Sequence, residues 1–562
     1  MIQFSEMPYT RPDVDGLKKK LEDATRRVTQ ATAYDEVKAA YFDVQQTYDE
    51  AESLCTLAYV RNTIDTSDDY YDGEVRWTNE EMARMIPYVK SWNEALAGTS
   101  FRADLEAEFG AQMLRLIDAE LLTSDEKIIP EKIEDAEICQ DYQKTTAQAS
   151  VDFRGENCNF YGLLKHMEST DRQERREAFE AWAGLYEQIS PQLDDHYSRL
   201  VRLRDSSARK MGFPTYTEMA YLNRHRFDYT QDDAKRFRDQ VRDIITPAVA
   251  KIGEHQRKRL GLDSIKYYDE ALRFPEGNAK PIGTMPELVE KARIMYEAMS
   301  SETGEFFNFM KDYQLFDLET RPNKHMGGYM TRFETYKAPF IFSNFNGTSA
   351  DVDVLTHEAG HAFQGYLAMR SIPVSSLRSS TSEINEIHSM TMEHFAYPWM
   401  DSFFGENAEK YRTAHLIEAL GCIPYLVSVD EFQHRVYADP DMSAMDRRAV
   451  WHEIEGIYMP WRDYDGNKFM EEGGFWMQKQ HIFLYPFYYI EYALSQICAF
   501  QYYNRMKQDR AKAWSDYLNL CRAGGTKGYL ELLKIGNLKS PFEEGTVEEA
   551  TGEVIEEILG KY

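Results

Sequence analysis

The N-terminal third of the chain follows the hydrophobic spacing of amphipathic helices. Apolar side chains recur at i, i+3 and i+4 with charged residues between them, which places them on one face of a helix. No fixed-period repeat or low-complexity tract is present, so the pattern predicts individual helices rather than a solenoid of identical units. The clearest helical stretches are 15–28, 34–59, 101–122, 171–189 and 192–211.

The pattern changes after Asn323. Residues 327–336 begin with two glycines and then alternate loosely, and residues 338–347 form a second β-like run. Together they predict an antiparallel pair, with Pro339 placing the second run at a sheet edge or at a strand start. Helical spacing then returns in 349–369, 382–403, 411–438, 447–458 and 488–507. The predicted fold is therefore mainly α with one small antiparallel β-sheet.

Length and composition indicate a globular protein of more than one lobe. A chain of 562 residues exceeds one ordinary hydrophobic core, and we expect an N-terminal helical region over 1–190 and a second region over 191–562. No apolar run approaches the ~20 residues that span a bilayer, and the first residues lack the pattern of a signal peptide. The six cysteines form no C-x-x-C pair. We therefore expect reduced thiols, a cytoplasmic location and no membrane partner.

The charge argues against a nucleic-acid partner. The net charge of −29 repels phosphate, and no basic stripe with interleaved aromatics stands out. The chain is rich in aromatic residues, with 37 Tyr and 30 Phe. Most of them belong to the core, although a peptide-binding channel would also use such side chains.

One short segment carries the clearest chemical signal. His357 and His361 are four residues apart, so on a helix both imidazoles lie on one face and can reach one Zn²⁺ at ~2.0–2.1 Å. Glu358 is placed to take a proton from a zinc-activated water and deliver it to a leaving amine. This H-E-x-x-H pattern is typical of metalloproteases. The small residues Ala359 and Gly360 between them indicate the close approach of another helix or backbone.

A catalytic zinc needs a third protein ligand and an open fourth position. Spacing alone does not choose the third ligand among five side chains of the helix that begins near Ser382. The candidates are Glu383, Glu386, His388, Glu393 and His394. Glu386 and Glu393 are seven residues apart and share a face, so one can ligate while the other orients a ligand histidine.

Together these segments resemble the thimet oligopeptidase and oligoendopeptidase F family. Glu386 follows His357 by 29 residues and precedes Glu393 by seven, as in that family, and Ile387-His388-Ser389 is similar to the oligoendopeptidase F or Pz-peptidase branch. The resemblance implies one Zn²⁺ per chain on His357, His361 and Glu386. It further implies that Glu358 is the general base and that Glu393 orients a ligand histidine without binding the metal. It also implies an edge strand over 338–353 that pairs with the peptide backbone.

The resemblance extends to a third cluster, between residues 481 and 492. The family carries a histidine and tyrosines in a comparable segment, and these match His481, Tyr485 and Tyr492, with Tyr489 nearby. Such side chains can donate hydrogen bonds to the oxyanion that forms during peptide hydrolysis. The same tyrosines also satisfy the spacing of a helix packed into the core.

The resemblance also implies a two-lobed helical metallopeptidase that encloses a deep channel, and the long helical region 1–190 would form one channel wall. The implied activity is endopeptidase cleavage of short, unstructured oligopeptides. Two alternatives remain open at this point: a metallocarboxypeptidase on a related scaffold, and a helical peptide-binding protein without catalysis. An intact Glu358 argues against the second alternative, because a binding protein needs no general base.

Overall fold

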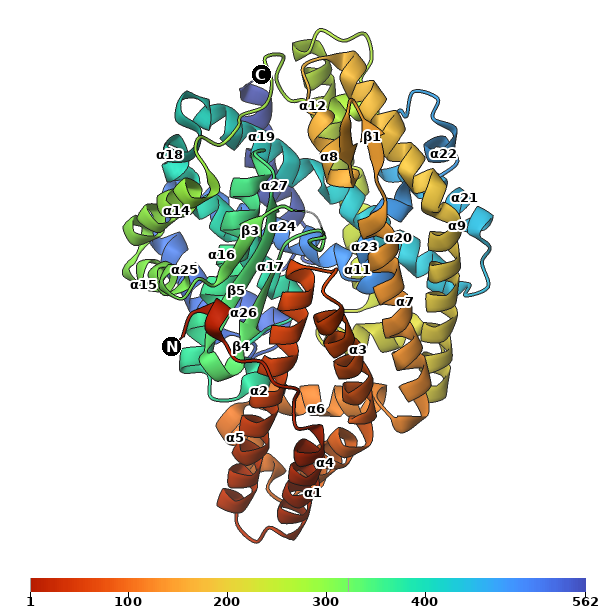
Figure 1. Cartoon of the computed structure of the whole chain (residues 1–562). Coiled ribbons are helices and arrows are strands. Elements are labelled where there is room, and N and C mark those ends of the chain that lie inside the picture. Colours follow the sequence, from red (N-terminus) through yellow and green to blue (C-terminus); the bar gives the residue numbers. More distant parts are fainter. Residues whose placement is uncertain (1, 322, 562) are drawn as a thin grey trace.

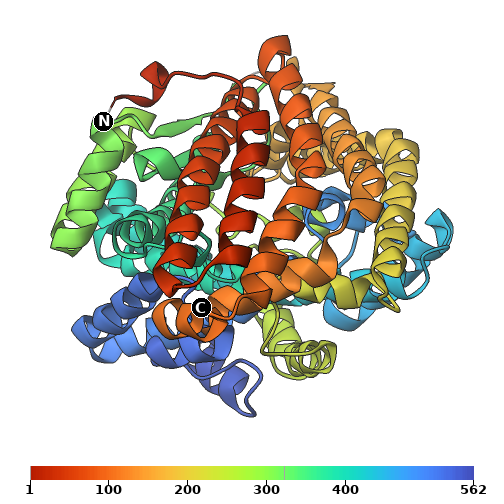
Figure 2. The same ribbon diagram turned by 90° about the horizontal axis from the view of Figure 1, so that it is seen from below.

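The computed structural model describes residues 2–321 and 323–561 and consists mainly of helices (Figure 1). The first helices pack around a core of their own, in which Leu17, Leu21, Val37 and Trp92 are buried. Seen from below, α1 and α2 run side by side across this face (Figure 2). This group comprises α1 (Val14–Gln30), α2 (Tyr34–Ile64), α3 (Asp69–Arg84), α4 (Ile86–Gly98), α5 (Arg102–Phe109) and α6 (Ala111–Thr123).

Several predicted helical stretches differ from the structure. The stretches 382–403 and 411–438 are each divided, the first after Phe395 and the second at Cys422. The stretch 101–122 is divided at Gly110, whose φ of +90° ends α5 before α6 begins. The stretches 171–189 and 192–211 form the single helix α9 (Arg172–Met211), which continues through Pro191. Ile189 and Leu193 on either side of this proline are buried, so tertiary packing overrides the local break. The predicted division between residues 190 and 191 falls inside α9 and stays a prediction.

The segment between the first helices and the main sheet adds more helices and a hairpin that the pattern did not predict. β1 (Val151–Phe153) and β2 (Glu156–Cys158) pair antiparallel. Each has three residues, which is too short for alternation to be recognised. The helices are α7 (Ile129–Gln148), α8 (Phe160–His166), α10 (Tyr216–Asn223), α11 (Gln231–Gln240), α12 (Thr246–Arg259), α13 (Tyr267–Glu270), α14 (Met285–Met299) and α15 (Ser301–Asp312).

The main sheet has the order β3–β5–β4. β4 (Tyr329–Phe333) and β5 (Ala338–Phe345) pair antiparallel as predicted, and Pro339 lies at the strand start. However, β3 (Phe316–Glu319) pairs parallel with the other side of β5. The sheet is therefore mixed, and the prediction that 338–353 begins with an edge strand was wrong. β5 is central, consistent with its almost continuously buried side chains, and β4 is an edge strand.

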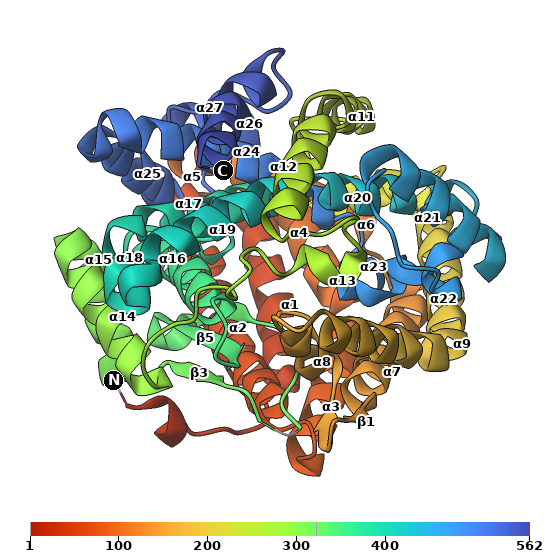
Figure 3. The ribbon, with the colours of Figure 1, turned by 90° about the horizontal axis from the view of Figure 1, so that it is seen from above.

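Helices α16 (Ala350–Ser371) and α17 (Ser382–Phe395) lie between α14 and α15 on one side and α9, α21 (Ala444–Tyr458) and α22 (Lys468–Glu471) on the other (Figure 3). α16 packs on β5, and α17 packs between α16 and α24 (Tyr489–Gln508). The remaining helices are α18 (Met400–Phe404), α19 (Ala408–Gly421), α20 (Ile423–Ala438), α23 (Gln480–Leu484), α25 (Arg510–Ala523), α26 (Tyr529–Ile535) and α27 (Thr546–Gly560).

The first helices contact the sheet beside α16. The Tyr329 hydroxyl on β4 lies 2.6 Å from the Thr63 hydroxyl on α2, and the rings of Tyr59 and Tyr329 are 5.6 Å apart. A cavity of about 540 Å³ opens next to these contacts, with walls from α2, α3, α4 and α7. Among the described residues, no helix is both long enough and apolar enough to cross a membrane.

Candidate active site

Helices α16 and α17 bring three potential metal ligands together. His357 and His361 are one turn apart on α16, and Glu386 projects toward them from α17. Oε2 of Glu386 lies 3.2 Å from Nε2 of His357 and 3.3 Å from Nε2 of His361. Ligand atoms at ~2.0–2.1 Å around a tetrahedral ion are separated by about 3.3–3.4 Å. These three donors therefore fit one metal ion of that geometry.

The close approach of the two helices depends on Gly360. A Cβ atom at this position would lie 2.6 Å from the carbonyl oxygen of His388 and 2.7 Å from Cα of Ser389. Both atoms belong to the backbone of α17, so any larger residue would push the helices apart. The expectation that the small residues of α16 permit close helix packing is confirmed.

A chain of buried hydrogen bonds begins at Nδ1 of His357, the ring nitrogen that does not face Glu386. Glu393 Oε1 lies 2.6 Å from Nδ1 of His357, and Glu393 Oε2 lies 2.8 Å from Nε2 of His415. The other nitrogen of His415 lies 2.6 Å from the Tyr397 hydroxyl. Burial opposes ionisation of Glu393, but the two histidines outweigh it and lower the pKa of this carboxyl to about 2. A carboxylate behind a ligand histidine fixes the ring orientation, so Glu393 lies where the sequence predicted.

Glu358 lies beside the three donors and is itself almost buried. Its Oε2 atom has no hydrogen-bond partner among the described residues. Burial raises the pKa of Glu358, while His361 and His357 oppose that shift. An unpartnered carboxylate with a raised pKa beside a metal site suits a general base. Gly328, just before β4, passes close by, since a Cβ there would lie 3.7 Å from Oε1 of Glu358.

His481 and Tyr492 lie next to this group. The Tyr492 hydroxyl is 3.5 Å from Nε2 of His481, and the charge of Glu386 acts on both residues. Burial and then Glu386 raise the pKa of Tyr492 well above its usual value. Burial lowers the pKa of His481 to about 3. A protonated phenol and a neutral imidazole are both able to donate a hydrogen bond.

The other tyrosines of the segment point to different surroundings. The Tyr488 hydroxyl donates to Oε1 of Glu386 at 2.5 Å, a contact that the sequence reasoning missed. Its four-residue separation from Tyr492 was the available signal, because it places both rings on one face. The ring of Tyr489 packs 4.9 Å from that of His481 and also lines an adjoining cavity. Tyr485 is 45% exposed.

The remaining candidates on α17 lie outside the ligand group. Glu383 accepts a hydrogen bond from the Tyr229 hydroxyl, and the ring of His394 packs 5.0 Å from that of Tyr503. The ring of His388 packs 6.3 Å from that of Tyr517. His415 on α19 was missed because a single histidine on a helix gives no signal of its distant partner.

A second group of potential ligands occurs in the described residues. Glu156 and Cys158 of β2 and His166 of α8 place one donor atom each within 4.8 Å of one another. Nδ1 of His166 is engaged by Glu174 at 2.6 Å. The carboxylate that adjoins this group, Glu174, has both oxygens engaged, by His166 and by Ser169, and so differs from the unpartnered Glu358.

Comparisons with known proteins agree with this geometry. The profile described as "Peptidase family M3" matches residues 165–553, and that of the "Peptidase M3 N-terminal domain" matches residues 4–124. The solved structure "PZ peptidase A with inhibitor 2" is 41% identical, with a TM-score of 0.98 and coverage of 99% of both chains. The oligoendopeptidase-F structure from Enterococcus faecium, at 16% identity and a TM-score of 0.63 over 98% of this chain and 99% of that one, shares the fold.

The chain is also similar to a curated relative, the chromosomal oligoendopeptidase F of Lactococcus lactis subsp. cremoris. The two are 22% identical over 410 residues, which make up 66% of this chain. The aligned part spans 61% of the relative's own length.

Proposed function

Because the chain belongs to peptidase family M3, we propose that it is a zinc-dependent endopeptidase that cleaves internal bonds of short, unstructured oligopeptides. One zinc ion per chain is held by His357, His361 and Glu386. The observation that carries this proposal is the convergence of these three donors beside the unpartnered, buried carboxylate of Glu358. The resemblance seen in the sequence to the oligoendopeptidase F and Pz-peptidase branch is confirmed by the matches.

Different residues of the chain carry out the separate proton-transfer and hydrogen-bonding steps of hydrolysis. When bound, zinc supplies a Lewis acid that polarises the scissile carbonyl and makes water more acidic. Glu358 takes a proton from the attacking water and transfers it to the leaving amine. Tyr492 and His481 donate hydrogen bonds to the oxygen on which negative charge develops. Catalytic roles for Tyr485 and Tyr489 stay predictions, as does a cytoplasmic location.

The substrate backbone extends the main sheet. β4 pairs with β5 on one side, and among the described residues its other side has no strand partner. Since Gly328 at its start approaches Glu358, a peptide added along β4 passes the general base. Backbone pairing of this kind tolerates many sequences. This role replaces the one that the sequence analysis gave to residues 338–353.

Metal content and turnover together test these assignments. Glu358→Gln should keep close to one zinc per chain and lose nearly all turnover, because the amide cannot accept a proton. His361→Ala and Glu386→Ala should lose zinc as well. Zinc is measured by mass spectrometry and turnover on a peptide blocked at both ends, whose cleavage excludes an obligate carboxypeptidase.

Cys158→Ser is the matched control, because it changes the second ligand group and should leave both quantities unchanged. Equal zinc loss in the three active-site variants would mean that Glu358 is a ligand rather than the base.

A further inference from the structure

A second cavity of about 470 Å³ adjoins the catalytic segment. Tyr489 forms part of its wall, and the same ring packs 4.9 Å from His481 and 5.5 Å from Tyr492. The ring of Tyr489 thus lies next to both the cavity and the proposed oxyanion donors, His481 and Tyr492. Lys479 and Tyr425 also line it.

Lys479 differs from the other charged residues that line this cavity, because its ammonium group forms no ion pair with the described residues. Among the described residues, no carboxylate lies within 4.0 Å of its Nζ, which instead lies 5.0 Å from the ring centroid of Tyr489 and 5.6 Å from that of Tyr425. The other charged lining residues are all in ion pairs. These pairs are Arg257–Glu254 at 2.7 Å, Arg462–Glu270 at 3.0 Å and Arg273–Glu418 at 2.6 Å.

A desolvated cation without a counterion is costly, and an anionic ligand would offset that cost. Burial lowers the pKa of Lys479 to about 8, so the side chain remains mostly charged at pH 7. A second donor, Tyr425, lines the same cavity. The Tyr425 hydroxyl accepts a hydrogen bond from Nε2 of Gln478 at 2.5 Å, which leaves its own proton to donate.

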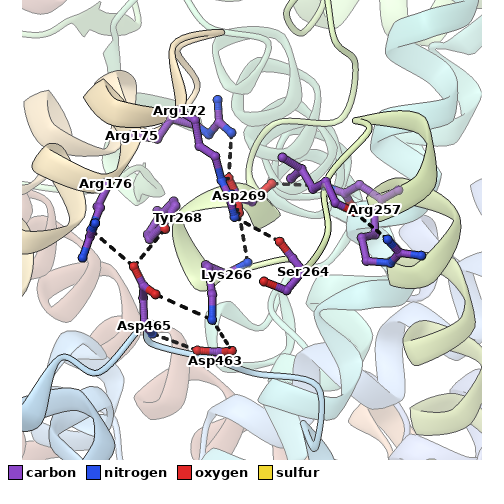
Figure 4. A network of polar contacts seen from close by, with 12 residues as sticks. Arg172, Arg175, Arg176, Arg257, Ser264, Lys266, Tyr268, Asp269, Asp463 and Asp465 are labelled. Carbon is purple, nitrogen blue, oxygen red and sulfur yellow. Dashed lines mark hydrogen bonds and ion pairs between the residues drawn. The ribbon is translucent and has the colours of Figure 1, made fainter.

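Ion pairs hold α13, which contributes part of the cavity wall, against α9 (Figure 4). Tyr267 and Glu270 of this wall belong to α13. The fully buried Asp269 between them accepts hydrogen bonds from Arg172 and Arg175 of α9 at 2.7 and 2.6 Å.

A second set of contacts holds the neighbouring loop. Lys266 pairs with Asp463 at 2.6 Å, and Arg176 pairs with Asp465 at 3.2 Å. Lys266 directly precedes α13 and Arg176 lies on α9, so the two ion pairs hold the loop that carries Asp463 and Asp465 against both helices. With both sets of contacts, α13 and its contribution to the cavity wall are fixed in position.

We propose that Lys479, with Tyr425 as a neighbouring donor, binds the C-terminal carboxylate of a peptide substrate in this cavity. The inference rests on the proposed peptidase function and adds a specificity-determining residue to it. The ligand is a peptide carboxylate, of the main-chain terminus rather than of an acidic side chain, because every peptide with an unmodified C-terminus carries the former whatever its sequence.

The spacing of the rings limits how far the terminus lies from the scissile bond. From Tyr488, which contacts Glu386, successive ring and ammonium separations are 5.1 Å to Tyr492, 5.5 Å to Tyr489 and 5.0 Å to Lys479. At ~3.3–3.6 Å per extended residue, this path accommodates about five residues or fewer. Cleavage is therefore expected within about five residues of a free C-terminus.

Three versions of one peptide test the subsite. The first has a free C-terminal carboxylate, the second has a C-terminal amide, and the third has the amide and an aspartate as last residue. The wild-type protein should cleave the free acid with a kcat/KM about 10–100-fold higher than the amide. Lys479→Met should abolish this preference by slowing cleavage of the acid alone, and Lys479→Arg should keep much of it. Lys468→Met, at a highly exposed lysine, is the control and should behave as wild type.

Binding provides a second readout that needs no turnover. Calorimetry with the inactive Glu358→Gln protein should show tighter binding of the acid than of the amide. Equal values for acid and amide in the wild-type protein would overturn the proposal, as would equal losses on both peptides in Lys479→Met. A preference for the aspartyl amide over the plain amide that matches that of the acid would overturn the assignment to the chain terminus. No cleavage of any peptide by the zinc-loaded protein would instead contradict the proposed function.

Discussion

Tyr488 and Tyr492 have different roles in the 485–492 segment, because their hydroxyl groups contact different side chains. Tyr492 approaches His481 and experiences the charge of Glu386, whereas the Tyr488 hydroxyl donates directly to Glu386. The same chemical change therefore has different consequences at the two positions.

We predict that Tyr492→Phe reduces kcat by roughly 10²–10³ with little change in KM, because an oxyanion donor acts on the transition state. Zinc affinity should stay unchanged. Tyr488→Phe should instead lower zinc affinity, by about 10–100-fold, because it removes a hydrogen bond that orients a ligand. Steady-state kinetics and competition with a chelator measure the two effects. An unchanged kcat in Tyr492→Phe would favour a packing role for that ring.

The pH dependence of stability should reflect a largely buried histidine outside the metal-ligand group, His434. Burial lowers the pKa of His434 to about 4 from a usual value of 6.5, against the opposing charge of Asp430. Between these values the unfolded chain binds a proton that the folded protein does not bind. The free energy of unfolding should therefore fall as pH decreases from about 6.5 to about 4, by up to ~1.4 kcal/mol per pKa unit.

Urea unfolding at a series of pH values measures this dependence. His434→Gln, which carries no titrating group, should show a shallower loss of stability on acidification than the wild-type protein. The exposed His452 supplies the control, since His452→Gln should leave the slope unchanged. Equal slopes in all three proteins would mean that His434 titrates normally in the folded state.

At the scale of elements, the pairing of α16 with α17 positions the ligands, because two of the three lie on one helix and the third lies on the other. Gly360 sets the distance between them. We predict that Gly360→Ala destabilises the protein by about 1–3 kcal/mol, as overpacking does in other cores. It should also weaken zinc binding by displacing Glu386.

Gly184→Ala on α9 is the matched substitution, since a Cβ atom there meets nothing within 4 Å. That change should leave zinc binding unchanged and stabilise the helix by about 0.5–1 kcal/mol. Thermal unfolding and zinc titration of both variants provide the comparison. Wild-type zinc affinity in Gly360→Ala would show that the helices can separate without moving the ligands.

At the scale of the whole molecule, the first helices lie against the catalytic region. A contact between α2 and β4 joins the two, and the cavity of about 540 Å³ opens beside that contact, with walls from α2, α3, α4 and α7. We propose that residues 1–190 form one wall of a deep channel. A folded substrate would have to unfold before entering, at a cost of ~5–15 kcal/mol.

Short unstructured peptides should therefore be cleaved efficiently, and folded proteins should resist attack. Long disordered chains should also be poor substrates, because an enclosed channel excludes their flanking segments. The measurement compares kcat/KM for a short peptide with that for the same sequence placed inside a long disordered polypeptide. Comparable values would point to an open cleft.

The sequence by itself determined the features that depend on local spacing. Helical periodicity placed most helices, and a four-residue separation put His357 and His361 on one face. Within a helix the direction of each side chain follows from the backbone geometry. The family resemblance supplied Glu386 and Glu393, which are separated from the histidines by a turn between two helices.

Only the tertiary structure decided which distant elements meet. The pattern of β5 does not identify β3 as its parallel partner, so the edge of the sheet was assigned to the wrong strand. The continuous apolar run of β5 was a signal of a central strand. Tyr488, His415 and Lys479 gain their roles from partners in other elements, and such contacts depend on packing that no local pattern encodes. Pro191 shows the same limit, because the buried side chains of Ile189 and Leu193 on either side of this exposed proline keep α9 intact where local preference predicts a break.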